Sequence, residues 1–67
     1  MAQPITDDQI VEMLYRKLVD RSQTALAREM NISVSYLHDV LVGRTPPGPL
    51  VLKFFGYERI ETIVVKR

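Results

Sequence analysis

The sequence predicts a mainly α-helical domain of four or five short helices, followed by a C-terminal β-strand. Three observations predict this fold class. Apolar residues recur at helical spacing over residues 6–55, a Ser or Thr that can cap a helix precedes each of the first three apolar segments, and β-branched residues gather in residues 60–66. A chain of 67 residues builds one small hydrophobic core, so we expect a single domain over residues 1–67.

The first helix is expected to begin at Thr6 and to end near Asp20. Thr6 and Gln9 have the spacing of a capping box, and the two acidic residues between them favour the positive end of the helix dipole. The residues expected to face the core follow at helical spacing: Ile10, Val11, Leu14, Leu18 and Val19.

Two short helices are expected next. Ser22 can cap a helix over Gln23–Met30, and Asn31 after it tolerates the left-handed backbone conformation better than most residues. Ser33 can cap a third helix over Val34–Val42.

A stiff, proline-rich connector over residues 44–49 follows Gly43, which is a suitable end for the third helix. Pro49 can start a fourth helix over Pro49–Phe55, which would stop at Gly56. The core face of this helix is expected to come from Leu50, Val51, Phe54 and Phe55.

Residues 60–66 are rich in β-branched residues and predict a C-terminal strand. No good second strand is visible in the chain, because residues 2–5 are few and include Pro4. A lone strand leaves its backbone groups unpaired, so we predict pairing with the same strand of a second copy; folding back onto its own domain is the alternative. The residues expected at this dimer interface are Ile60, Thr62, Ile63, Val64 and Val65.

The pattern over residues 23–43 is the most informative part of the chain. Several of its apolar residues face inward together if two short helices meet at a sharp turn. These residues are Leu26, Met30, Ile32, Leu37 and Val40. Ala27 is small where the two helices must cross closely, and a single long helix fits less well because Asn31 and Ser33 combine a turn residue with a new helix cap.

This segment resembles the helix-turn-helix of the Cro, phage-repressor and XRE family. The residues that carry the resemblance are Gln23, Ala27, Ile32, Ser33, Leu37, Val40, Gly43 and Arg44. With the proline-bearing link and the LVLKFFGYE segment that follows it, the resemblance covers about residues 6–60. The sequence departs from the family at Asn31, where glycine is usual. The resemblance implies a lambda-repressor-like fold and a DNA-binding regulator.

The resemblance also implies that the second helix of the motif enters the major groove of DNA. The residues it places over base edges are Ser33, Val34, Ser35, Tyr36, His38 and Asp39. Ser35 and His38 can hydrogen-bond to bases, and Val34 can contact a thymine methyl group. This face has no Arg, Lys, Gln or Asn, so we expect modest direct readout and some dependence on DNA shape.

Four residues are candidates for phosphate contact. Gln23 stands at a helix start, where backbone N–H groups can also hold a phosphate, and Arg44 follows the recognition helix; Arg21 and Lys53 are weaker candidates. Other roles stay open for the base-contacting set, because the ring of Tyr36 could pack on the helix surface and Asp39 could pair with a nearby Arg.

The net charge of +1 gives little support for a polyanionic partner, but its distribution is uneven. Residues 1–20 contain two basic and four acidic side chains. Residues 21–44 contain three basic and two acidic side chains, and residues 45–67 contain four basic and two acidic side chains. Positive charge therefore lies in the middle and C-terminal parts, where it could reach phosphates.

No enzyme constellation is visible, because the chain has one His, no Cys, no glycine-rich phosphate loop and no spaced metal ligands. We therefore expect no catalysis, no cofactor and no bound metal. The absence of Cys and of a signal-like N-terminus favours the cytoplasm of a bacterial or phage-infected cell, with the protein on the nucleoid when bound to DNA.

The favoured hypothesis is a Cro-like repressor that binds a palindromic operator in double-stranded DNA as a homodimer, with no membrane or small-molecule partner. The alternative is a protein-interaction module, an antitoxin or adapter, on the same scaffold. Non-specific architectural DNA binding ranks last, because that role needs a larger basic excess.

Overall fold

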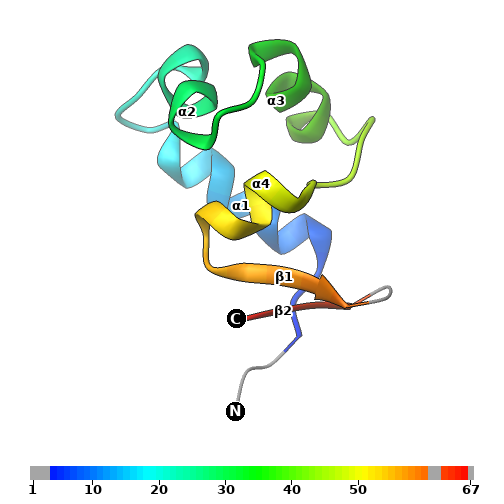
Figure 1. The fold of residues 1–67 in the computed structure, drawn as a ribbon. Coiled ribbons are helices and arrows are strands. Elements are labelled where there is room, and N and C mark those ends of the chain that lie inside the picture. The colour runs from blue at the N-terminus through cyan, green and yellow to red at the C-terminus, as the bar shows by residue number, and fades with distance from the viewer. Residues whose placement is uncertain (1–3, 61–62, 67) are drawn as a thin grey trace.

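The computed structural model describes residues 4–60 and 63–66, which form four helices and a two-stranded antiparallel sheet (Figure 1). The elements are α1 (Asp7–Lys17), α2 (Gln23–Met30), α3 (Val34–Leu41), α4 (Pro49–Phe54), β1 (Tyr57–Ile60) and β2 (Ile63–Lys66). Figure 1 shows α2 and α3 at one end of the molecule and the two strands at the opposite end, with α1 and α4 between them.

Helix α1 begins at the predicted capping box. The Thr6 hydroxyl accepts the Gln9 amide at 3.2 Å, and Gln9 Oε1 accepts the Thr6 amide at 2.8 Å. The helix ends at Lys17, earlier than the predicted end near Asp20. The Val19 amide bonds back three residues in a tight turn, so Val19 is 86% exposed, and its predicted place in the core is wrong.

Helices α2 and α3 confirm the predicted bend. The Ser22 hydroxyl accepts the Ala25 amide at 3.1 Å, and the Ser33 hydroxyl accepts the Tyr36 amide at 3.0 Å. Between them Asn31 has φ 61° and ψ 42°, the left-handed conformation that the sequence predicts. Helix α3 ends at Leu41, one residue before the predicted end.

The core joins all four helices to the sheet. Its buried residues are Ile10, Leu14, Leu26, Ala27, Met30, Leu37, Val40, Leu41, Val51, Leu52 and Val64. Ala27 is 1% exposed, as expected of a small residue where two helices cross closely, whereas Ile32 in the turn is only half-buried. The predicted core position of Leu50 is wrong: α4 turns Val51 and Leu52 inward and leaves Leu50 47% exposed at its N-terminal end.

The C-terminal region is an antiparallel hairpin, and the expectation of a single strand over residues 60–66 without a partner in the chain is wrong. β1 pairs with β2 in a register that sets Tyr57 opposite Lys66 and Ile60 opposite Ile63. On the other side of β2, the Ile5 amide donates to the Val64 carbonyl at 2.9 Å. A second copy is therefore not needed to pair β2, and the predicted interface residue Val64 lies 2% exposed in the core of its own chain. Thr62 lies outside the described residues.

Candidate nucleic-acid interface

Helix α3 presents a solvent-facing side at its N-terminal end. Ser33, Val34, Ser35 and His38 are exposed, and Val34 is 41% exposed although it is apolar. The bend at Asn31 directs the start of α3 away from the core, since the side chains that pack inward are those of Leu37, Val40 and Leu41. Four of the six predicted base-contacting residues therefore lie together on one free surface.

Asp39 is half-buried and shapes the start of the loop between α3 and α4. Its carbonyl accepts the amides of Arg44 and Thr45 at 2.9 and 3.4 Å, and its carboxylate lies 3.9 Å from Arg44 Nη1. The interpretation of Asp39 as a partner of a nearby Arg is confirmed. Its carboxylate faces Arg44 at the C-terminal end of α3.

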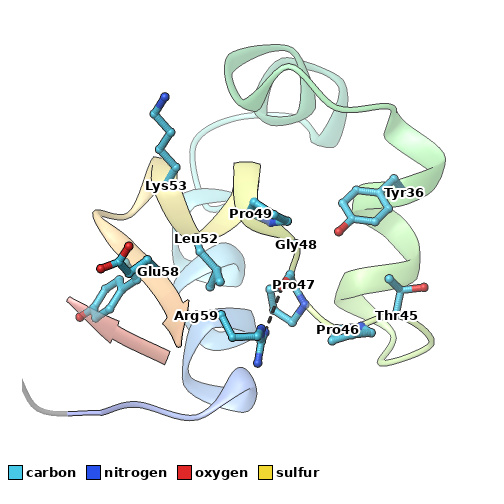
Figure 2. A pocket seen from close by; sticks show the side chains of 11 residues that line it. Tyr36, Thr45, Pro46, Pro47, Gly48, Pro49, Leu52, Lys53, Glu58 and Arg59 are labelled. Atoms are coloured by element: carbon cyan, nitrogen blue, oxygen red, sulfur yellow. Dashed lines mark hydrogen bonds between the residues drawn. The ribbon is translucent and has the colours of Figure 1, made fainter. Parts of the chain in front are cut away.

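Tyr36 is half-buried and turns its ring toward Gly48 and Pro49 at the start of α4 (Figure 2). A Cβ atom at Gly48 would collide with the Tyr36 hydroxyl. The hydroxyl makes no hydrogen bond within residues 4–60 and 63–66, so it keeps its capacity to donate to another molecule. Tyr36 therefore stands between the exposed side of α3 and the loop.

The predicted phosphate contacts are spread over the surface. Gln23 is exposed as the first residue of α2, and the Arg44 side chain is 76% exposed just after α3. Lys53, in the last turn of α4, points its ammonium group outward (Figure 2). Arg21 is only 30% exposed and pairs with Glu29 and, at 3.8 Å, with Asp20, so its charge is already partly neutralised.

One basic residue beside the exposed side of α3 was not singled out by the sequence analysis. Arg28 and Thr24 are one turn apart on α2 and line a shallow hollow of about 330 Å³ next to Ser33 and Val34. Arg28 is exposed and, within the described part of the chain, forms no ion pair. The signal available was the four-residue spacing of Thr24 and Arg28, which places both on one helix face close to the turn.

A second hollow, of about 640 Å³, lies between α3, the loop, α4 and β1 (Figure 2). Its walls are Tyr36, Thr45, Pro46, Pro47, Gly48, Pro49, Leu52, Lys53, Tyr57, Glu58 and Arg59. Across its floor the Arg59 guanidinium donates to the Pro47 carbonyl at 3.1 Å. Sequence reasoning gave Arg59 no role.

Within residues 4–60 and 63–66, no three His, Asp or Glu side chains come close enough to hold a metal ion. None of the described helices has the length and apolar character needed to cross a bilayer.

Comparison with known proteins agrees with this geometry. A protein-family model described as helix-turn-helix matches residues 13–54, which include all of α2, α3 and α4. No curated protein and no solved structure gives a match. The family is a DNA-binding regulatory one and not a family of enzymes. Because the match covers more than half of the chain and includes both helices of the motif, the protein belongs to the XRE-type helix-turn-helix family of DNA-binding domains.

Proposed function

We propose that the protein is a transcriptional repressor that binds a palindromic operator as a homodimer. The observation that carries this proposal is the exposed surface at the start of α3, where Ser33, Val34 and Ser35 begin two residues after the left-handed Asn31. Repression would come from occupying the operator, and the protein would act on the nucleoid in the cytoplasm.

The protein would recognise the base sequence of DNA through hydroxyl, imidazole and methyl groups. Ser35 and His38 offer hydrogen bonds to base edges in the major groove, and Val34 offers a contact to the thymine methyl group. These contacts discriminate less than a bidentate Arg or Gln would, so DNA shape contributes to operator choice. Tyr36 reaches a base or phosphate only if its hydroxyl turns from Gly48.

Phosphate contacts would fix the domain on the duplex. Gln23 and the free N–H groups of the first turn of α2 face one strand, and Arg44 clamps the backbone beyond α3. Arg28 adds a cation beside the start of α3. Arg21 and Lys53 contribute general positive potential.

Dimerisation through the C-terminal hairpin is supported by exposed apolar surface there. Ile60, at the end of β1, is 55% exposed. The outer side of β2 is already bonded at Val64 by Ile5, so strand pairing with a second copy would have to use the outer edge of β1. Binding to successive major grooves would require the two α3 helices of the dimer to lie about 34 Å apart.

The first experiment is to identify the operator. Selection from random duplexes should enrich a two-fold symmetric site, and footprinting should protect two half-sites. Arg44→Ala should weaken binding to that site and lower the slope of log Kd against log salt by about 2, because each of the two subunits loses one phosphate contact. Enrichment of no sequence, or an unchanged slope in Arg44→Ala, would contradict the proposal.

The dimer has its own test. Ile60→Lys should convert dimers to monomers in light scattering and abolish protection of the second half-site, because a charge would be buried in the interface. Val19→Lys is the matched control, since Val19 is also an exposed apolar residue but lies near the end of α1. If Ile60→Lys scatters like the parent, the hairpin is not the interface.

A protein-interaction module is the second candidate. The low basic content of α3 and the exposed Val34 and Leu50 near its start favour it. If selection enriches no duplex even at low salt while a protein partner protects Val34 in hydrogen exchange, this candidate replaces the repressor.

A further inference from the structure

The loop between α3 and α4, residues 42–48, carries Arg44, and the amides of its first four residues donate to carbonyls of α3. Its first half is tied to α3 through the amides of Arg44 and Thr45, both bonded to the Asp39 carbonyl. Pro46 and Pro47 have no N–H, and in the described residues the second half donates no backbone hydrogen bond. The second half is joined to α4 by the Gly48 carbonyl, which accepts the Leu52 amide at 3.0 Å, and further restraint on Pro46 and Pro47 comes from other parts of the molecule.

Arg59 holds it from the hairpin side. Its Nη2 donates to the Pro47 carbonyl at 3.1 Å and to Asp7 Oδ1 at 2.8 Å. Pro47 is buried, and the Arg59 and Asp7 side chains are only 31% and 40% exposed, so this ion pair is partly shielded from solvent. One guanidinium thus links the start of α1, the loop and β1, as Figure 2 shows for the contact with Pro47.

Tyr36 holds the same half of the loop from the other side. Its ring lies against Gly48, leaving no room for a Cβ atom there. Gly48 and Pro47 are neighbours, so Tyr36 of α3 and Arg59 of β1 contact the loop at adjacent residues. A loop fixed at both ends presents Arg44 in one place relative to the exposed side of α3.

We propose that Arg59 is a positioning residue for DNA binding, which orients the loop so that Arg44 meets a phosphate while Arg59 itself does not touch DNA. This inference rests on the proposed phosphate contact of Arg44. It assigns to Asp7 the role of orienting the guanidinium, since the carboxylate fixes the side chain that reaches Pro47.

Two carboxylates in the first turn of α1 provide a matched pair of variants. Asp7→Asn and Asp8→Asn each remove one negative charge from the same helix end, so general electrostatics should strengthen DNA binding in both alike. Asp8 is exposed and forms no ion pair with any described residue. We expect Asp7→Asn to weaken binding of the enriched duplex several-fold in fluorescence anisotropy, while Asp8→Asn binds as tightly as the parent or tighter. Equal behaviour of the two variants would overturn the proposal.

A double-mutant cycle tests whether Arg59 acts through Arg44. Arg44→Ala should cost about tenfold in the parent but less than about twofold in an Arg59→Met background, because the misplaced loop no longer delivers Arg44. Two results would indicate that Arg59 contacts a phosphate directly and would overturn the proposal. The first is that the losses of affinity in Arg44→Ala and Arg59→Met add up in the double variant. The second is that Arg59→Lys binds as tightly as the parent while Asp7→Asn binds more tightly.

The DNA-free protein separates this inference from the proposed function. In NMR spectra the amides of Arg44, Thr45 and Gly48 should shift in Asp7→Asn and stay in place in Asp8→Asn. This measurement still tests the role of Arg59 if the Arg59→Met variant fails to fold. A parent that binds no duplex overturns the repressor proposal, whereas loop amides that do not move in Asp7→Asn overturn the role of Arg59.

Discussion

At the scale of single residues, local chemistry made the bend at Asn31 predictable. An Asn side chain accepts the left-handed conformation with less strain than most side chains, and Asn31 adopts it at φ 61°. The same local reasoning identified Ser22 and Ser33 as caps. It could not find the roles of Tyr36 and Arg59, because Gly48 and Pro47 meet them only after the chain has folded.

The contact between Tyr36 and Gly48 gives a prediction at this scale. Gly48→Ala should destabilise the domain by up to about 1 kcal/mol, because the new methyl group forces the hydroxyl end of the half-buried Tyr36 side chain to move. In a Tyr36→Phe background the oxygen is gone, and Gly48→Ala should be neutral or stabilising by up to about 1 kcal/mol. Urea unfolding of the four proteins measures both effects. An equal loss in the two backgrounds would show that the clash is not with the hydroxyl.

At the scale of elements, the sequence predicted the helices well and the hairpin badly. The ends of α2, and the starts of all four helices, follow from caps and turn residues that act within a few positions. β1 carries no such signal: Tyr57–Ile60 has two charged residues at its centre, and its pairing depends on Ile63–Lys66 further along the chain. Strand pairing of this kind depends on tertiary context rather than local propensity.

The two serine caps allow stability to be separated from DNA contact. Ser22→Ala and Ser33→Ala should each cost about 1 kcal/mol, since each hydroxyl accepts one amide at a helix start. Ser33→Ala should weaken operator binding more than Ser22→Ala does, because Ser33 lies on the exposed side of α3 that we propose to read bases. Thermal unfolding and duplex titration measure the two effects. If Ser22→Ala weakens binding as much, Ser33 acts as a cap alone.

At the scale of the whole molecule, the hairpin is part of the core and cannot be treated as an appendage. Val64 lies among the buried residues of the helices, and a chain of 67 residues has little core to lose. Removing the hairpin would therefore disturb folding as well as the proposed dimerisation. This is why an exposed residue such as Ile60, and not a deletion, suits the test of dimerisation.

Val64→Ala tests this coupling. The variant should lose about 2 kcal/mol of unfolding free energy, from the lost burial and the cavity left behind, and the loss should appear in the melting of the helices by circular dichroism. Val19→Ala should change stability by less than about 0.5 kcal/mol, because Val19 is exposed. Helices that melt at the parent temperature in Val64→Ala would mean that the hairpin folds independently.

The contact between Ile5 and Val64 has a consequence for protein engineering. It brings both ends of the described chain to the pole of the molecule opposite α2 and α3 (Figure 1). A fluorescent tag fused at either end would project away from α3 but would lie beside the hairpin that we propose as the dimer interface. The same proximity makes the fold a candidate for circular permutation, with a short linker joining the old ends and new ends opened at an exposed turn.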